Sequence, residues 1–212
     1  LFEEHMELLM KLNREEVVTW EGKFRPSLDE AEIAPRPVQE QIPVWIGVGG
    51  TLESAARAGR LGAGMALAIL SGNPKNFKPL IEHYYEAGKK AGHPPELLKL
   101  AITGHAYLAE TMDQADEFYP YYSNYKYYFN RKRGFGRKIA REEFEELIGP
   151  DTALFVGSPE DVAEKIIRQH EIFGHTRFLA QLDIGGLPFE KVAQSIELLA
   201  TKVVPILKDA IR

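Results

Sequence analysis

The sequence predicts an α/β fold built on a parallel sheet, because short apolar strands alternate with helices along most of its 212 residues. Strands are expected at residues 44–47, 65–70, 98–108 and 176–182. Only these four core strands are recognisable, whereas a (β/α)8 TIM-type barrel has eight strands in typically ~250 residues. We therefore expect residues 1–212 to form a single domain equivalent to strands five to eight of such a barrel.

The remaining segments follow this alternation. Helices are expected at residues 1–17, 51–61, 76–91, 112–122, 162–173 and 189–211, where apolar residues recur at helical spacing. Residues 18–25 resemble a short hairpin or extended arm, and the prolines of 26–43 indicate an irregular connection. Because the chain starts at Leu1 inside a predicted helix, we expect further sequence before it.

Four strands cannot close a barrel, so the first and last predicted strands would have open edges. The side of the sheet that would line a closed barrel would also stay uncovered. The candidate residues for this exposed apolar layer are Trp45, Met65, Leu67 and Phe178. An uncovered apolar face of that size predicts self-association, most simply as a homodimer.

Composition excludes several classes of function. The net charge of −5 gives no global basic surface for nucleic acid, and no apolar run approaches the roughly 20 residues that cross a bilayer. The chain has no Cys, which excludes disulfides and thiolate nucleophiles, and its six His are scattered. We expect a cytoplasmic protein without a metal site and without nucleic-acid or membrane partners.

The most informative segment lies at residues 44–51, where an apolar strand enters a glycine turn and then a helix. Free backbone N–H groups at such a helix start, together with the helix dipole, favour an anion such as a phosphate. However, the spacing is neither a Walker loop nor G-x-G-x-x-G. Glycine turns that serve only the change from strand to helix are common, and spacing alone favours that structural interpretation.

Several motifs in fixed order resemble the bacterial luciferase-like flavin monooxygenase family. They are residues 35–39 (PRPVQ) before 42–46 (IPVWI), 49–57 (GGTLESAAR), 157–163 (GSPEDVA), 183–188 (DIGGLP) and 195–200 (SIELLA). In that family the loop after strand five holds the flavin phosphate. The resemblance therefore implies that Gly49, Gly50 and Thr51 bind phosphate, with Val48 lining the approach.

The resemblance also implies an activity. Reduced FMN would react with dioxygen and oxidise a small, apolar organic substrate, while the protein positions the ring and excludes water. A deazaflavin is the alternative cofactor, because its phosphate would suit the same turn. A different class of hypothesis is a non-catalytic fragment that binds flavin or assembles through its open edges.

His105 is the best ionisable candidate, since an imidazole that faces the barrel interior would hydrogen-bond the flavin or a peroxide oxygen. The alternative is a core histidine satisfied by the backbone. Strand alternation places Thr103, His105 and Tyr107 on one face and Gly104 and Ala106 on the other. Tyr107 is therefore a candidate for the rim of the substrate site.

Residues 119–155 form a segment rich in aromatic and basic residues, which we interpret as an insertion within the domain. Packing on the barrel or a lid is the first interpretation, a dimer contact the second and nucleic-acid stacking a distant third. Arg137, next to Gly136, is a candidate for binding an anionic substrate or phosphate.

The last predicted strand is followed by Asp183, Gly185 and Gly186, at the strand end where barrel enzymes build their active sites. The two glycines would let a ligand approach the backbone, and Asp183 would orient it. The alternative is a turn in which Asp183 hydrogen-bonds its own loop. The sequence alone leaves both interpretations open.

Overall fold

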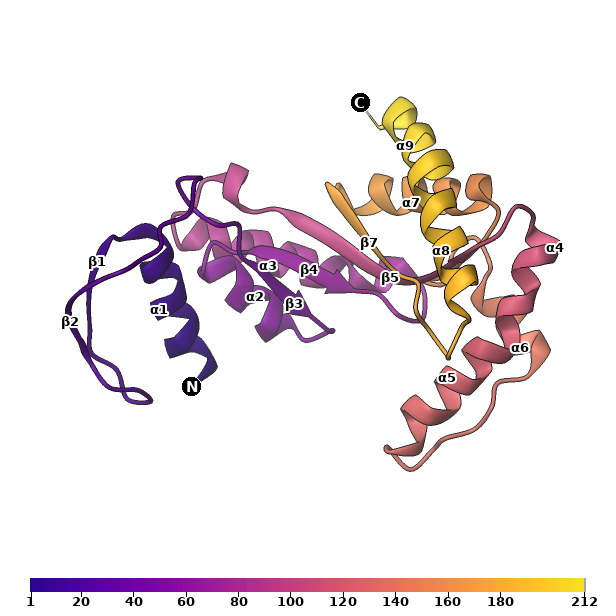
Figure 1. Ribbon diagram of the computed structural model, residues 1–212, viewed down its shortest axis with the longest axis horizontal. Coiled ribbons are helices and arrows are strands. Elements are labelled where there is room, and N and C mark those ends of the chain that lie inside the picture. The colour runs from indigo at the N-terminus through magenta and orange to yellow at the C-terminus, as the bar shows by residue number, and fades with distance from the viewer. Residues whose placement is uncertain (212) are drawn as a thin grey trace.

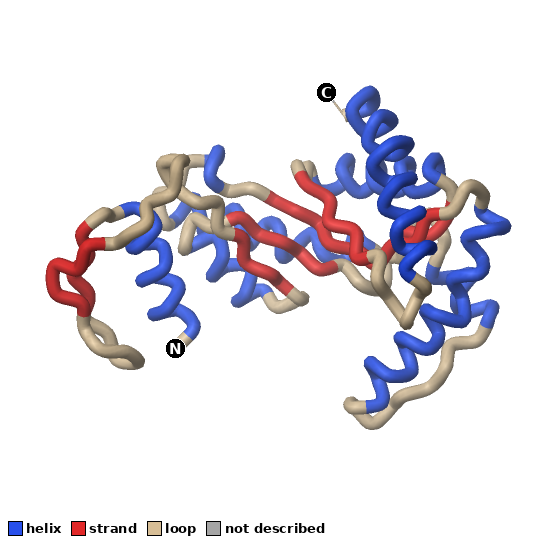
Figure 2. The backbone as a smooth tube through the Cα atoms, in the orientation of Figure 1, coloured by secondary structure: helices blue, strands red, loops and turns tan. Residues whose placement is uncertain are grey.

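The structure, a computed structural model, describes residues 1–211 and contains a five-stranded parallel sheet (Figures 1 and 2). The strands are β3 (Trp45–Val48), β4 (Gly64–Ala68), β5 (Leu100–Leu108), β6 (Phe155–Gly157) and β7 (Arg177–Gln181). They run in the order β3-β4-β5, and both β6 and β7 pair with β5. The four predicted strands are confirmed; the three-residue β6 is additional. In the described chain the sheet stays open, with β3 at one edge and β6 and β7 at the other.

One face of the sheet is covered by α2 (Leu52–Arg60), α3 (Lys78–Lys90) and α7 (Pro159–Phe173). These helices start at strong sequence signals. The side chain of Thr51 caps α2, and Ser158 forms a capping box with Asp161 at α7. The order β3-α2-β4-α3-β5 is thus a repeated βαβ unit, as the alternation predicted.

The register of the strands corrects one expectation. Met65 and Leu67 are 0% exposed and pack against the covering helices, and Phe178 packs on Phe155 with ring centroids 4.6 Å apart. They therefore lie on the covered face, and only Trp45 belongs to the opposite one. The sequence shows that successive side chains of a strand point to opposite faces of the sheet, but it does not show which of these two faces the helices cover.

The opposite face carries small side chains between Trp45 on β3 and His105 on β5. Pairing aligns Gly47 with Ala66 and Ala66 with Ala101, and aligns Ala68 with Thr103. We call this surface the sheet floor; its members are Gly47, Ala66, Ala68, Ala101 and Thr103. At the amino-terminal end of the strands, the Arg177 guanidinium of β7 lies 4.8 Å from the centre of the Trp45 ring on β3. The Arg177 side chain therefore reaches across β5 and β4.

Helices α4 (Met112–Ala115), α5 (Tyr119–Arg131) and α6 (Arg141–Leu147) lie over the carboxyl-terminal part of β5. A 3-10 turn separates α4 from α5, so the single helix expected at 112–122 is in fact two. Their buried side chains form a cluster on the same face as the sheet floor, which we call the aromatic cap. Its main members are Tyr107, Phe118, Tyr122 and Phe144.

The two ends of the chain flank this body. Helix α1 (Phe2–Arg14) leads into a hairpin of β1 (Val17–Trp20) and β2 (Leu28–Glu32), the arm at the left of Figure 1. The carboxyl end is α8 (Phe189–Leu198), a π-helical turn and α9 (Val204–Ala210). No helix within residues 1–211 has the length and apolar character needed to cross a membrane.

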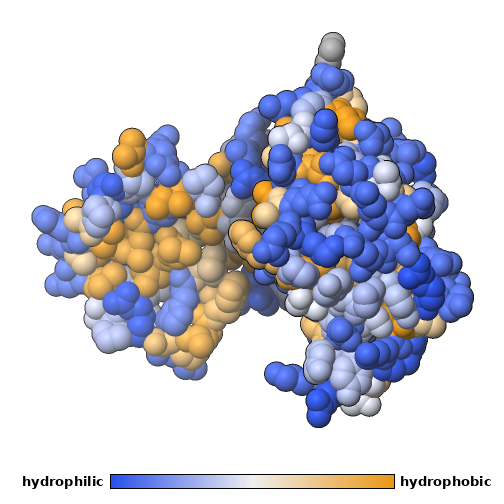
Figure 3. Space-filling model, turned by 45° about the vertical axis from the view of Figure 1, so that its right-hand side comes forward, coloured by the Kyte–Doolittle hydropathy of each residue, from blue (hydrophilic) through white to orange (hydrophobic). Residues whose placement is uncertain are grey.

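Exposed large apolar side chains are numerous in the first part of the chain, and Leu179 of β7, which pairs with Thr103 of the sheet floor, is exposed as well. Figure 3 shows orange residues in the left part of the molecule and a mostly hydrophilic surface over the C-terminal helices. The large apolar residues exposed there include Leu1, Phe2, Leu9, Val17, Phe24, Val38, Ile42 and Leu52. The uncovered apolar surface therefore includes α1, the arm and the connection after it.

Candidate functional site

The glycine turn after β3 is exposed and open. A Cβ built at Gly47, Gly49 or Gly50 would have no neighbouring heavy atom within 4 Å. Gly50 has φ +130°, which other residues rarely adopt, whereas Gly49 has no such conformation. The turn therefore leaves free space in front of its backbone, and Gly50 is the position that requires glycine for conformational reasons.

Thr51 connects this turn to α2. Its hydroxyl accepts a hydrogen bond from the Ser54 N–H at 3.3 Å and donates to the Ser54 Oγ at 2.7 Å. The other N–H groups of the first turn of α2 point in the same direction as the helix dipole, which suits an anion. Val48 contributes only backbone here, because its side chain is 1% exposed and packs against the helices.

His105 lies on the face of β5 that carries the sheet floor, beneath α5. Its ring is 2% exposed, and its Nε2 is 3.4 Å from the Tyr125 hydroxyl. The Nδ1 is buried without a hydrogen-bond partner. Burial, and secondly the charge of Lys126, lowers the pKa of His105 to about 4, so the imidazole is neutral at pH 7. A neutral imidazole offers one donor and one acceptor.

Tyr107, two residues further along β5, is part of the aromatic cap rather than of an open rim. It is 1% exposed and stacks on Phe118 at 4.9 Å between ring centroids. Its hydroxyl donates to Glu117 Oε1 at 2.5 Å, and Lys191 Nζ lies 2.5 Å from Glu117 Oε2. These contacts join the end of β5 to the first turn of α8.

The remaining candidates do not converge on one point. The Arg137 side chain is exposed and forms an ion pair with Glu143 at 2.7 Å. Asp183 is exposed in the loop after β7. Gly185 has φ +72°, and a Cβ there would collide with the Tyr121 carbonyl, so packing on α5 explains this glycine. Gly186, with φ +79°, has open space around it.

Sequence reasoning missed two sets of residues that define the surroundings of His105 and Tyr107. The aromatic rings at 118, 122, 125 and 129 recur at helical spacing, and this signal predicts one aromatic face on α5. No comparable signal connects Glu117 and Lys191, which are 74 positions apart. Within residues 1–211 no group of three or more His, Asp and Glu is placed to hold a metal ion.

Solved structures share this architecture. A monooxygenase from Streptomyces bottropensis superposes with a TM-score of 0.74 at 25% identity, covering 96% of this chain and 60% of that one. The oxygenating constituent of 3,6-diketocamphane monooxygenase, from the CAM plasmid of Pseudomonas putida and in complex with FMN, gives 0.69 at 21% identity, with coverage of 96% and 62%.

A third similar structure is the coenzyme F420-dependent tetrahydromethanopterin reductase from Methanopyrus kandleri. It has a TM-score of 0.67 at 20% identity and covers 96% of this chain and 62% of that one. The chain thus spans about 60% of the length of these proteins. Residues 1–176 match the sequence model of the luciferase-like monooxygenases. With its parallel sheet, open glycine turn and matching sequence, the chain belongs to the luciferase-like monooxygenase family.

Proposed function

We propose that this chain binds FMN and forms the cofactor-binding part of a monooxygenase that uses dioxygen to oxidise a small, apolar organic substrate. Its family membership supports an oxidoreductase. The observation that carries the proposal is the sheet floor, which runs between the open glycine turn and the buried His105. Between Trp45 and His105, the largest side chain on this face of β3, β4 and β5 is Thr103.

The residues present fit a flavin. The backbone N–H groups at 49–51 would hold the phosphate, and the small side chains of the sheet floor would let a flat ring system approach the strands. When bound, reduced flavin supplies the reaction with dioxygen itself. The aromatic cap would exclude water from one end of this surface.

His105 has a positioning role in this proposal. Its buried Nδ1 has no hydrogen-bond partner within the chain and would bind a polar group of the ring or substrate, and at neutral pH the imidazole carries no charge. It therefore orients a ligand by hydrogen bonding rather than acting as a permanent cation. Asp183 and Gly186 lie in the loop after β7 and are proposed as substrate contacts at the same end of the sheet.

A deazaflavin is the second candidate cofactor. Two structures with the same fold are described as coenzyme F420-dependent, a secondary alcohol dehydrogenase and the reductase from Methanopyrus kandleri. Because a phosphate would occupy the same turn in either case, the turn does not distinguish the two cofactors. Parallel titrations with FMN and coenzyme F420 do.

The test measures how much the phosphate contributes to binding. FMN and riboflavin differ only in that group, so wild-type protein is expected to bind FMN at least about tenfold more tightly by fluorescence titration. Gly49→Gln fills the open space without a conformational penalty and is expected to remove this difference. Equal affinity of the wild type for FMN and riboflavin would contradict a phosphate site at this turn.

The chain offers a matched control for the cap of α2. Thr51 and Thr111 both cap helices, and each hydroxyl accepts an N–H at 3.3 Å. Thr51→Ala and Thr111→Ala therefore lose similar local interactions, but only Thr51→Ala is expected to weaken FMN binding. A loss of the same size in both variants would mean that helix stability, and not phosphate contact, was measured.

We also propose that the sheet corresponds to strands five to eight of a (β/α)8 barrel, with β6 as an extra strand. The open edges at β3 and β7, and the apolar residues exposed on α1 and the arm, support further chain or a second copy covering them. Light scattering on residues 1–212 is expected to show self-association. A monomer at all concentrations that binds no hydrophobic dye would contradict this proposal.

A further inference from the structure

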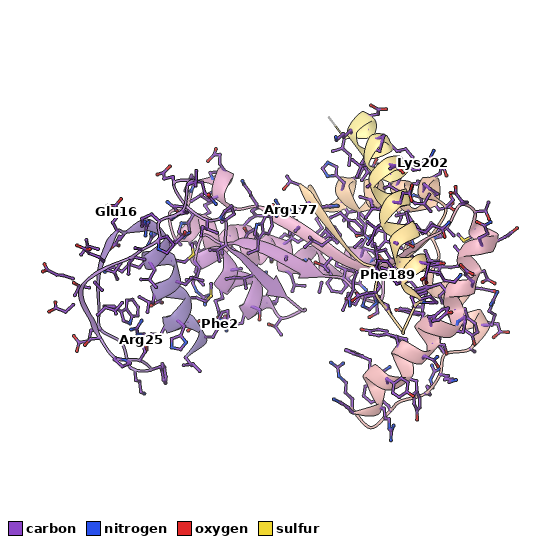
Figure 4. The ribbon with its side chains drawn as sticks, in the orientation of Figure 1. Phe2, Glu16, Arg25, Arg177, Phe189 and Lys202 are labelled. Atoms are coloured by element: carbon purple, nitrogen blue, oxygen red, sulfur yellow. The ribbon has the colours of Figure 1, made fainter. Side chains whose placement is uncertain are left out.

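A cavity lies far from the glycine turn, between α7, the start of β7 and α9. Its volume is about 350 Å³. The apolar residues that line it include Ile166, Phe178, Val204 and Leu207. It opens at the amino-terminal end of β7, where Figure 4 labels Arg177, whereas the candidate cofactor site lies at the carboxyl-terminal ends of the strands. We call it the α7–α9 groove.

The titratable side chains that line this groove are all basic. Its lining includes Lys208, His170 and His175, and none of the residues that line it is Asp or Glu. Arg177 also lines the groove, but its guanidinium stacks on Trp45. An apolar surface with basic groups and no acidic lining is complementary to a ligand with an apolar body and one negative charge.

His175 supplies an independent indication of a ligand. It is 4% exposed, and its Nδ1 is buried without a hydrogen-bond partner. Buried polar atoms are rarely left without a partner, because the lost hydration is not replaced. The neighbouring His170 Nδ1 donates to the His175 carbonyl at 2.8 Å, since a carbonyl only accepts.

We propose that the α7–α9 groove binds the carboxylate of a medium-chain aliphatic acid. Lys208 and the Nδ1–H of His175 bind the carboxylate, and the methylene chain lies along Ile166, Phe178 and Leu207. The cavity volume is at the lower end of the range for small-molecule sites, which suits a short chain. The site does not depend on the proposed flavin function, because it uses none of the same residues.

Octanoate is the probe, titrated by calorimetry into the protein without flavin. A dissociation constant of about 0.1 mM is expected for a ligand of this size. Hexanoate, which lacks two methylenes, is expected to bind roughly tenfold more weakly. Octanol, which lacks the charge, is expected to bind at least about tenfold more weakly. Equal binding of octanol, or no saturable binding of octanoate at millimolar concentration, would overturn the proposal.

Variants locate the site. Lys208 is exposed, so Lys208→Glu keeps the fold and is expected to weaken octanoate at least about tenfold. Lys202→Glu is the matched control: this lysine is exposed in the preceding helical segment, is labelled in Figure 4 and does not line the groove. Leu207→Trp is expected to fill the groove and abolish binding. Equal affinity of the Lys208→Glu and Lys202→Glu variants would show that the carboxylate lies elsewhere.

Discussion

The glycine turn and the aromatic cap lie on the same sheet but are built in different ways. The turn consists of consecutive residues, is exposed, and presents backbone groups. The cap combines Tyr107 of β5 with rings from the 3-10 turn before α5, from α5 and from α6, and its main members are 0–1% exposed. A local backbone site tolerates change in distant residues, whereas the cap depends on contacts between segments far apart in sequence.

Removing a central ring of the cap should therefore have the largest effect on stability. Phe118 is 0% exposed and contacts Tyr107, Tyr122 and Phe144. Phe118→Ala is expected to lower the free energy of unfolding by about 3–5 kcal/mol in urea titrations. Phe129, on the neighbouring helix α5 but 43% exposed, is the control, and its Ala variant should lose less than about 1 kcal/mol. Similar losses would mean that the cap is not a packed core.

Lys165 tests how the cap is fastened to the covered side of the sheet. Its Nζ donates to Ile148 O, Thr152 Oγ1 and Leu154 O, at 3.0, 3.2 and 2.7 Å. These three acceptors lie between the end of α6 and β6. Burial lowers the pKa of Lys165 to about 8, because it disfavours the charged form more than the nearby Asp151 favours it.

Between pH 8 and about 10.4, the lysine of the unfolded chain binds more protons than that of the folded chain, so this group makes stability rise with pH. We expect the wild type to gain about 2 kcal/mol relative to Lys165→Met from pH 7 to pH 10. Urea titrations of both proteins at the two pH values measure this. A constant difference would mean that Lys165 has the same pKa in the folded and unfolded chains.

The turn has its own internal comparison. Because Gly50 has φ +130° and Gly49 does not need a positive φ, Gly50→Ala is expected to cost about 1–2 kcal/mol of unfolding free energy. Gly49→Ala should stay within about 0.5 kcal/mol. Thermal unfolding of the two variants measures this difference. If both variants cost the same, the strain in the turn is not localised at Gly50.

The sequence predicts those features that arise from neighbouring residues. Apolar runs identified the four main strands, and alternation placed Thr103, His105 and Tyr107 on one face, as the pairing of β5 confirms. The glycine turn and the Thr51 cap were also predictable, since both are local backbone features. The binding roles given to these residues remain predictions.

Features that depend on distant partners were not predictable. Strand β6 has only three residues, too few for a periodic signal. The choice of Met65 for the uncovered layer was wrong, because alternation defines two faces without saying which one the helices cover. The environment of His105 depends on Tyr125, whose position follows from the packing of α5.

The smallest expected effect concerns the ion pair at the edge of the cap. Lys191, and then the Tyr107 hydroxyl, lowers the pKa of Glu117. Because the pKa of Glu117 is lower in the folded chain, its carboxylate stabilises the fold at pH values above the unfolded-state pKa of about 4.3. This stabilisation is lost as the pH falls through the folded-state pKa. Because Glu117 is 43% exposed and therefore screened, Glu117→Gln is expected to cost at most about 1 kcal/mol at pH 7.

The pH dependence separates this charge effect from simple loss of packing. At pH 7 the variant lacks the carboxylate that binds Lys191 and Tyr107, whereas at pH 3 the wild-type carboxylate is becoming protonated and the two proteins should converge in stability. Glu143→Gln, which removes the partner of the exposed Arg137, is the control and should stay within about 0.5 kcal/mol at both pH values. If Glu117→Gln lowers the free energy of unfolding by the same amount at pH 3 as at pH 7, the contact stabilises the aromatic cap by packing rather than by charge. The aromatic cap and the glycine turn would then differ in packing but not in electrostatics.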